Sequence, residues 1–142
     1  MSYGKYEECL NSIGSPWRWD KRPKYQDRYS TSERISDSRS RLYSLLLNEK
    51  QIGYSLTVPR DDLSKIFRVQ VGEIENFGLS VKHNGHGYGA PFFKHVCNEL
   101  FQQGFDAIFL STRSTNHEKV LPFYEKLGMS IIKQVTKKND LV

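Results

Sequence analysis

The segment Asn84-Gly85-His86-Gly87-Tyr88-Gly89-Ala90 lies between a predicted strand, which ends near residue 81, and a predicted helix. The backbone N–H groups of such a loop point toward one place, and the dipole of the following helix favours an anion there. Pro91 has no N–H, so the donors must come from residues 85–90. The segment predicts a phosphate or pyrophosphate site, while an ordinary turn is the alternative interpretation of a glycine cluster.

Two well-known phosphate-binding loops do not fit this segment. It lacks the Gly-Lys-Ser/Thr sequence of a P-loop. A dinucleotide-binding loop needs an acidic residue about 20 positions later, at the end of the second strand. Asp106 has roughly that spacing, but it begins its predicted strand instead of ending it.

The sequence on both sides of the loop predicts an α/β fold with a mixed sheet. The expected elements are strands at 42–47 and 52–58 around a turn at 48–50, a connection to about residue 67, a long strand through residue 81, an apolar helix ended by Gly104, a strand at 106–112, a helix at 117–127 and a strand at 129–135. Within the long strand we expect one face to carry Glu73, Glu75, Phe77, Leu79 and Val81.

Composition and charge narrow the class of protein. The chain has 142 residues, with 21 Lys+Arg against 16 Asp+Glu and a net charge of +5. This length and the 37% hydrophobic content fit one globular domain. No apolar run reaches the roughly 18 residues of a membrane span, and two cysteines are too few for a disulfide framework. We therefore expect a cytoplasmic protein without a membrane partner, and the scattered basic residues disfavour nucleic acid.

Two motifs resemble those of a known family. Residues 84–89 resemble the acyl-CoA-binding loop, Gln/Arg-x-x-Gly-x-Gly/Ala, of the GNAT N-acetyltransferases. The family's Tyr-Glu-Lys-x-Gly-Phe signature is similar to Leu121-Pro122-Phe123-Tyr124-Glu125-Lys126-Leu127-Gly128-Met129. The resemblance runs from about residue 42 to residue 135, with both motifs in the family's order. Within the family, three further segments resemble those of a bacterial subgroup with no assigned substrate: Pro16-Trp17-Arg18-Trp19, Phe77-Gly78-Leu79 and Ser111-Thr112-Arg113-Ser114-Thr115-Asn116-His117.

The resemblance implies one GNAT-like domain over residues 1–142, with a mixed sheet flanked by helices. Residues 1–41 would carry N-terminal helices and an acceptor-side loop, residues 42–135 the core sheet with the acetyl-CoA site, and residues 136–142 a tail. We see no strand before the first helix and none after residue 135, so the expected sheet lacks the family's usual first and last strands. Its exposed edge could then pair two copies in a homodimer.

The resemblance also implies acetyl-CoA as the co-substrate. Asn84 stands at the motif's usual Gln/Arg position, so one side-chain contact is expected to be lost while the backbone amides remain. The family's pantetheine-contacting Asn aligns with His117, next to Asn116, which reads equally well as a helix cap. The expected acetyl-CoA-binding residues are Leu79, Val81, Asn84, Gly85, His86, Gly87, Tyr88, Gly89, Ala90, Asn116 and His117.

The implied reaction transfers an acetyl group to an amine. A lysine-like amine has a pKa of about 10.4, so a base must remove its proton before it attacks. Glu73 or Glu75 is the expected base, and solvated strand carboxylates are the alternative. Tyr124 matches the family's general acid, which protonates or hydrogen-bonds the departing thiolate; a core tyrosine is the alternative. A backbone N–H near Leu79 is expected to stabilise the oxyanion.

The acceptor would be a small-molecule or peptide amine. Trp17, Trp19 and Arg22 fall where the family builds its acceptor site, although the two tryptophans also read as packing residues. His83 and His86 have no third ligand at a recognised spacing, so we expect no metal. Two other functions stay open: a non-catalytic acyl-CoA-binding or protein-interaction module on the same fold, and an RNA-associated basic domain.

Overall fold

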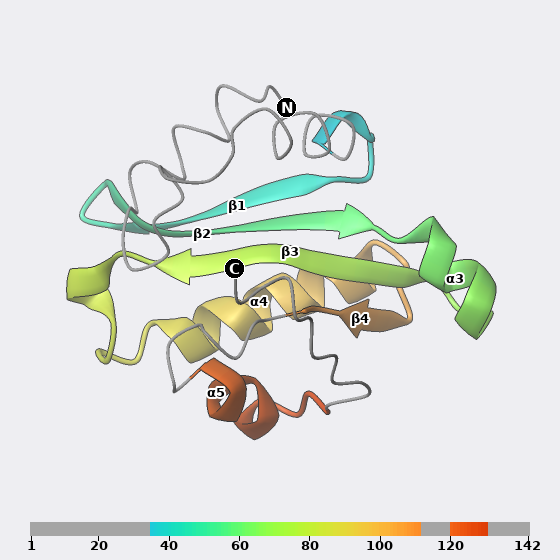
Figure 1. Cartoon of the computed structure of the whole chain (residues 1–142). Coiled ribbons are helices and arrows are strands. Elements are labelled where there is room, and N and C mark those ends of the chain that lie inside the picture. The colour runs from blue at the N-terminus through green and yellow to red at the C-terminus, as the bar shows by residue number, and fades with distance from the viewer. Residues whose placement is uncertain (1–34, 112–119, 131–142) are drawn as a thin grey trace, which may run out of the picture. The chain divides into compact units, whose positions relative to one another are not determined.

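A computed structural model describes residues 35–111 and 120–130 of the chain. The chain forms two compact units, Met1–Ser111 and Thr112–Val142. The described part of the first unit contains a four-stranded sheet in the order β1-β2-β3-β4 (Figure 1). The described part of the second unit contains the helix α5 (Val120–Lys126). The expected single domain over residues 1–142 stays a prediction.

The sheet is mixed, as predicted. β1 (Arg41–Leu47) and β2 (Lys50–Pro59) form an antiparallel hairpin, and β3 (Val71–Leu79) runs antiparallel to β2. β4 (Ala107–Phe109) pairs parallel to β3. The hairpin turn has only two residues, Asn48 and Glu49, with φ values of 51° and 68°. Positive φ at both turn residues is characteristic of a type I′ turn, whose twist matches that of the flanking strands and which needs only two residues.

The helix α4 (Gly89–Gln102) covers one face of this sheet (Figure 1). Its apolar stripe consists of Phe92, Phe93, Val96 and Leu100, and all four are buried. The Phe77 ring of β3 lies 5.2 Å from the Phe92 ring and 5.4 Å from the Phe93 ring. The predicted apolar helix is therefore confirmed, and these aromatic contacts tie it to the strand that precedes the glycine loop.

The central strand β2 is buried along most of its length. Residues 52–58 are all buried, and the side chains of Tyr54 and Leu56 have no exposed surface. A strand that is buried on both faces does not show the alternation of apolar and polar residues that a half-exposed strand has. Within the described residues, β1 and β4 are the edges of the sheet, and the expected homodimer through an exposed edge stays a prediction.

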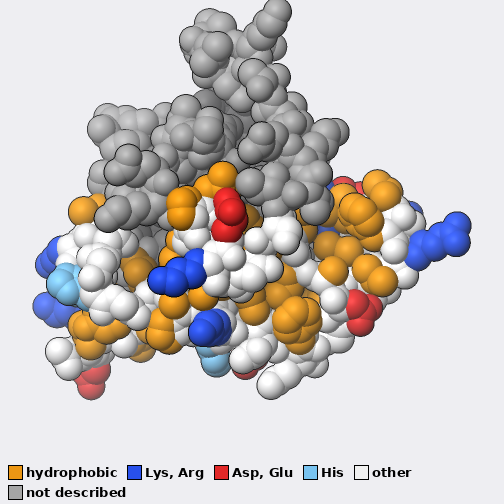
Figure 2. Space-filling model, turned by 90° about the horizontal axis from the view of Figure 1, so that it is seen from below, with side chains coloured by type: hydrophobic (Ala, Val, Ile, Leu, Met, Phe, Trp, Pro, Cys, Tyr) orange, Lys and Arg blue, Asp and Glu red, His pale blue; other side chains and the backbone are white. Residues whose placement is uncertain are grey.

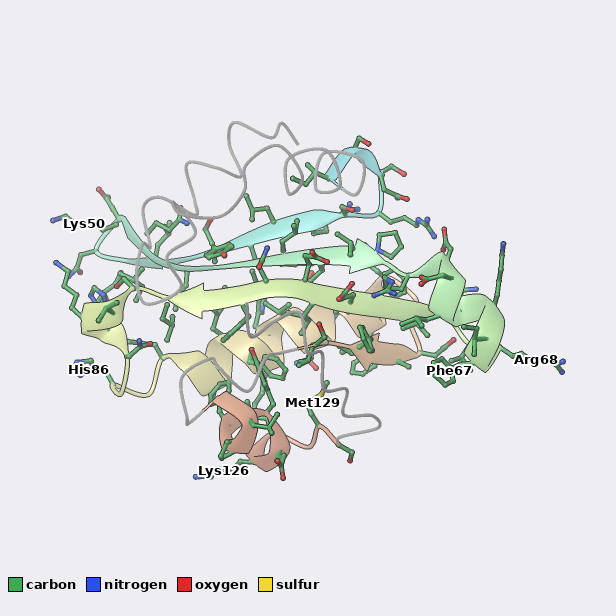
Figure 3. The ribbon with its side chains drawn as sticks, in the orientation of Figure 1. Lys50, Phe67, Arg68, His86, Lys126 and Met129 are labelled. Carbon is green, nitrogen blue, oxygen red and sulfur yellow. The ribbon has the colours of Figure 1, made fainter. Side chains whose placement is uncertain are left out.

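A short helix, α3 (Asp61–Phe67), occupies the segment that we expected to be a simple connection. It buries none of its residues, although Leu63, Ile66 and Phe67 have the spacing of an apolar helix face; seven residues are too few for that pattern to predict a helix. Ile66 and Phe67 are instead 70% and 54% exposed, and Figure 2 shows hydrophobic side chains at this end of the molecule. Phe67 and Arg68 lie at the opposite end of the sheet from Lys50 and His86 (Figure 3).

The long strand differs from its prediction in two ways. It ends at Leu79, and Val81 instead begins a single 3₁₀ turn, η2 (Val81–His83). The register with β2 also shifts, because Leu56 pairs with Asn76 but Thr57 pairs with Ile74. The extra residue, Glu75, is a β-bulge, which reverses the facing of the residues that follow it. The predicted shared face is therefore wrong: Phe77 and Leu79 lie on the α4 face, opposite to Glu73.

Several predicted features lie outside the described residues. They are the N-terminal helices, the proposed acceptor residues Trp17, Trp19 and Arg22, the proposed acetyl-CoA ligands Asn116 and His117, and most of the strand expected at 129–135. These stay predictions.

Gly53 of β2 leaves room for atoms of both neighbouring strands, β1 and β3. A Cβ at this position would lie 2.7 Å from Leu79 Cδ2, 3.1 Å from the Gly78 carbonyl oxygen and 3.3 Å from Leu45 Cβ. We predict that Gly53→Val lowers the free energy of unfolding by on the order of 1–3 kcal/mol, measured by denaturant titration. Ser44→Val, at an exposed position of β1, should change it by less than about 0.5 kcal/mol. Equal stability of the two variants would contradict this packing.

Candidate active site

The glycine loop joins η2 to α4 at one end of the sheet. Gly85 and Gly87 have φ values of +78° and +83°, a conformation that other residues rarely adopt. A Cβ at either position would meet nothing within 4 Å, so the loop surface is open there. The His83 and His86 rings each lie near the Tyr88 ring, at 6.3 and 6.4 Å between centroids. The loop is thus held by its own backbone and by short-range ring contacts.

The loop also carries backbone donors for an anion. The N–H groups of His83 and Asn84 bond to carbonyls within η2 and its N-cap, and the Phe92 N–H bonds to the Tyr88 carbonyl. No acceptor in the described part of the chain takes the N–H groups of residues 85–90. They precede or open a 14-residue helix, where the helix dipole favours negative charge. The residues present therefore fit a phosphate group.

The three-residue strand β4 pairs with only the first part of β3. The two strands pair only from Val71 to Glu73, although β3 continues to Leu79. The Ser80 N–H bonds to the Ile52 carbonyl of β2. Because successive N–H groups of a strand point to opposite edges, the Leu79 N–H points away from β2. The Leu79 N–H could therefore donate a hydrogen bond to an extended ligand.

Glu73 is a buried carboxylate at the point where the β3–β4 pairing ends. Its side chain is only 8% exposed, and Arg60 Nη1 donates to Glu73 Oε1 at 2.9 Å. Burial raises the pKa of Glu73 to about 7, and the negative charge of Glu75 adds to this rise. The Arg60 guanidinium opposes both effects. Near pH 7, Glu73 therefore exchanges readily between its protonated and charged forms, as a general base must.

The structure brings Glu73 and Glu75 together, as predicted. Their carboxyl groups interact closely enough for Glu75 to raise the pKa of Glu73 by charge and by hydrogen bonding. Residues two apart in a strand share a face, and the bulge at Glu75 reverses the facing only of the residues that follow it, so Glu75 stays on the side of Glu73. Glu73 is the more buried of the two residues, and its tuned pKa makes it the better candidate for a base.

Leu79 and Glu73 are far apart along the strand. With a rise of about 3.3 Å per residue, six residues separate them by roughly 20 Å. One acyl carbonyl cannot accept a hydrogen bond from the Leu79 N–H while its attacking amine contacts Glu73. The Leu79 amide therefore suits the arm of a long ligand better than the oxyanion role that we expected for it.

Tyr124 lies in α5 of the second unit. The Met129 N–H bonds to the Tyr124 carbonyl and the Gly128 N–H bonds to that of Glu125, so the signature segment closes the end of its own helix. The Tyr124 and Phe123 rings meet edge to face at 5.4 Å. Burial raises the pKa of Tyr124 to about 12, which keeps its hydroxyl protonated at neutral pH.

The acetyltransferase (GNAT) family matches residues 6–129, which is most of the chain. The chain belongs to the GNAT family. Family membership supports acetyl transfer as the general activity and acetyl-CoA as the substance that GNAT proteins generally use. The glycine loop and the Tyr124 segment of this GNAT protein thus fall inside the matched region. No curated protein matches the chain significantly.

Solved structures share the GNAT fold. A transcriptional regulator from Bacillus halodurans C-125 has a TM-score of 0.73 at 18% identity, covering 96% of this chain and 94% of its own. An aminoglycoside acetyltransferase from an uncultured soil metagenomic sample has a TM-score of 0.71 at 13% identity, covering 94% and 86%. A ribosomal-protein-alanine N-acetyltransferase from Brucella melitensis biovar Abortus 2308 has a TM-score of 0.63 at 11% identity, covering 94% of this chain and 90% of its own. Identities this low show the fold alone.

One residue of the candidate site, Arg60, could not be found from the sequence. Arg60 contacts Glu73, and the Arg60 guanidinium lies 5.2 Å from the centre of the Phe109 ring of β4. Arg60 stands in the charged run that closes β2, which reads as an ordinary polar strand end. No sequence signal relates it to a glutamate 13 positions later, because the contact depends on the pairing of β2 with β3.

Other side-chain groups do not add a site. Burial raises the pKa of the Cys97 thiol to about 11, so Cys97 is protonated and a poor nucleophile, as expected. Within residues 35–111 and 120–130, no three His, Cys, Asp or Glu side chains come together as metal ligands. In the same ranges, no helix has the length and apolar character needed to span a membrane.

The raised pKa of Glu73 has a consequence for stability. A glutamate in an unfolded chain has a pKa of about 4.3, below the folded value of about 7. The folded protein therefore binds the proton more tightly, and it loses stability as the pH rises from about 4 to above 7. We predict that Glu73→Gln, which removes this titration, is more stable than the unmodified chain at pH 8 by on the order of 1–3 kcal/mol.

Thermal unfolding between pH 4 and pH 8 measures this effect. The Glu73→Gln variant should melt several degrees higher at pH 8 and at nearly the same temperature at pH 4. Glu49→Gln, in the exposed hairpin turn, is the matched control and should follow the unmodified chain throughout. If the melting temperature of Glu73→Gln also follows that of the unmodified chain at every pH, Glu73 does not have the raised pKa.

Proposed function

We propose that this protein is an N-acetyltransferase that moves an acetyl group from acetyl-CoA to a primary amine by direct attack in a ternary complex. The observation that carries the proposal is Glu73, a buried carboxylate with a pKa near 7 at the point where the pairing of β3 with β4 ends. Membership of the GNAT family supports acetyl transfer. The amine acceptor and the direct attack are our inference from the chemistry of this site.

Acetyl-CoA supplies an activated acetyl thioester at the end of an extended arm. The N–H groups of residues 85–90 would hold its pyrophosphate at the start of α4. The Leu79 N–H would hold the arm along the edge of β3 that points away from β2. Leu79 and Glu73 are roughly 20 Å apart along β3, so the loop end and Glu73 would provide for the two ends of one long ligand.

Glu73 would remove the proton from the acceptor amine, directly or through water. Transfer from an amine of pKa about 10.4 to an ordinary glutamate of pKa about 4.3 is unfavourable by roughly 8 kcal/mol. Transfer to Glu73, with a pKa of about 7, is unfavourable by only roughly 5 kcal/mol. Burial and the Glu75 charge thus make Glu73 a stronger base while leaving it partly charged near pH 7.

Tyr124 would donate a hydrogen bond to the departing sulfur. Its pKa of about 12 exceeds that of a typical thiol, about 8.5, by more than 3 units. Complete proton transfer from this phenol to the thiolate is therefore unfavourable by roughly 5 kcal/mol. A hydrogen bond from a phenol that stays protonated is the role that this pKa favours over the expected general acid.

The acceptor is proposed as a small-molecule or peptide amine. Two solved structures with the same fold are of an aminoglycoside acetyltransferase, one of them in complex with sisomicin. Another is of a ribosomal-protein-alanine N-acetyltransferase. These enzymes are named for a small-molecule acceptor and for a protein acceptor, so both classes belong in the test. Trp17, Trp19 and Arg22 remain the proposed acceptor-side residues, and a cytoplasmic location without nucleic acid or a membrane as partner remains our expectation.

The reaction is tested by release of free thiol from acetyl-CoA. The amines are an aminoglycoside, a peptide with a free α-amine and a lysine-containing peptide. We predict turnover with at least one of them, a fall in kcat on the order of 10²-fold or more for Glu73→Gln, and about tenfold for Tyr124→Phe. Tyr43→Phe, which changes a part-buried tyrosine of β1, is the matched control and should retain activity. Acetyl-CoA binding without turnover of any amine would instead identify a binding module.

The loop assignment is tested by adding negative charge to it. We predict that Gly87→Glu abolishes acetyl-CoA binding in calorimetry, because its carboxylate would face the pyrophosphate. Gly87→Gln has nearly the same shape and the same backbone strain but no charge, so it should weaken binding less. The difference between the two variants should shrink as salt is added. Equal affinity of Gly87→Glu and the unmodified chain would refute the loop assignment.

A further inference from the structure

We propose that Arg60 is a positioning residue that holds the Glu73 carboxylate in place and in its charged, proton-accepting form. The inference rests on the proposed role of Glu73 as the base. Arg60 would touch neither acetyl-CoA nor the acceptor, and would act only through Glu73. Three features of the structure carry the proposal: the way the Arg60 backbone is held, the way its guanidinium is held, and the balance of charge around Glu73.

The Arg60 backbone is fixed on both sides by the junction of β2, α3 and β3. The Arg60 N–H bonds to the Val71 carbonyl at 3.0 Å, and its own carbonyl accepts from the Ser64 N–H and hydroxyl. The Ser64 hydroxyl oxygen also accepts the Val71 N–H at 2.9 Å. Ser64 thus links the first turn of α3 to the start of β3. This gives α3, which buries none of its own residues, a role in placing Arg60.

The guanidinium is held from three directions. Its Nε and Nη2 donate to the two carboxylate oxygens of Asp62, at 2.9 and 2.8 Å, in a two-pronged ion pair. Its plane lies near the Phe109 ring, 5.2 Å from the ring centre. The remaining nitrogen, Nη1, donates to Glu73 Oε1. Asp62 and Phe109 therefore orient the guanidinium, and its Nη1 group orients the carboxylate of Glu73.

Few charged groups face Glu73 in the described part of the chain. Glu75 on β3 raises its pKa, and Arg60 at the start of α3 lowers it. The paired residues on the neighbouring strands, Val58 of β2 and Phe109 of β4, carry no charge. Asp62 acts on Glu73 through Arg60. Loss of the Arg60 charge would thus leave burial and Glu75 unopposed, and Glu73 would stay protonated to higher pH.

A second arginine supplies a matched control. Arg39 also bonds to two carboxylates, those of Asp37 and Asp61, at 2.8 to 3.1 Å. Asp61 is the chain neighbour of Asp62, so both arginines meet the first turn of α3. Arg39 makes no contact with Glu73. Replacing it removes a comparable charge and a comparable pair of contacts without touching the proposed base.

The test is a pH titration of the Glu73 carboxyl group, followed by the ¹³C chemical shift of its carbon, on the full chain without acetyl-CoA or acceptor. Arg60→Gln should raise the midpoint of Glu73 by about 1–3 pH units, the range for loss of an adjacent opposite charge. Arg60→Lys, which keeps the charge but lacks the fork, should raise it less. Arg39→Gln should leave it unchanged. An unchanged midpoint in folded Arg60→Gln overturns the proposal.

The unmodified chain gives an independent readout if a variant fails to fold. The Arg60 Nη1–H resonance should move with pH at the same midpoint as the Glu73 carboxyl group, since Nη1 donates a hydrogen bond to Glu73 Oε1. A resonance that does not follow Glu73 also overturns the proposal.

Turnover distinguishes this inference from the proposed function. If Arg60→Gln raises the pKa of Glu73 from about 7 to about 8, the charged fraction of Glu73 at pH 7 falls about fivefold. The acetylation rate of the variant should fall by the same factor. The rate should recover above pH 9, which a general structural defect would not allow. A midpoint shift without a matching shift in the rate profile overturns the catalytic part of the proposal. A midpoint shift with no turnover of any amine, even by the unmodified chain, refutes the proposed function and leaves the Arg60–Glu73 coupling standing.

Discussion

The candidate site depends on the balance between burial of Glu73 and its ion pair with Arg60. A carboxylate this buried would be neutral and useless as a base without an adjacent positive charge. An arginine alone would hold it charged and weakly basic. Burial, the Glu75 charge and the Arg60 guanidinium together bring the pKa of Glu73 to about 7. The cost of this balance falls on the stability of the fold at neutral and alkaline pH, which is common where a site needs a strained electrostatic environment.

Strand β3 connects the two ends of the site. Its first residues pair with β4 and carry Glu73, its middle carries the bulge at Glu75, and its end leads through η2 to the glycine loop. The aromatic contacts of Phe77 with α4 fix the strand relative to the helix whose N-terminus completes the loop. One strand therefore sets the separation between an anion-binding end and a proton-accepting end, which is what an extended nucleotide thioester would require.

Sequence reasoning predicted the features that follow from local patterns. The hairpin, the apolar stripe of α4 and the glycine loop each leave a periodic or compositional signal, and the two GNAT motifs identified the family. It could not predict α3, a seven-residue helix that buries none of its residues, or the bulge at Glu75, which appears only in the pairing of two strands. Glu73 and Glu75 meet as expected because residues two apart in a strand share a face, and the bulge then turns Phe77 to the other face. Arg60 was missed because its contact with Glu73 is long-range.

The central claim is that one ligand lies along β3 with its phosphates at residues 85–90 and its thioester toward Glu73. Amide chemical-shift mapping of the full chain during an acetyl-CoA titration tests it most directly. The account predicts shifts at residues 85–90, at Leu79 and back along β3 to Glu73, with the shifts at the Glu73 end lost when only the pyrophosphate-bearing nucleotide part is added. Shifts confined to other elements, or no shifts at saturating acetyl-CoA, would contradict it.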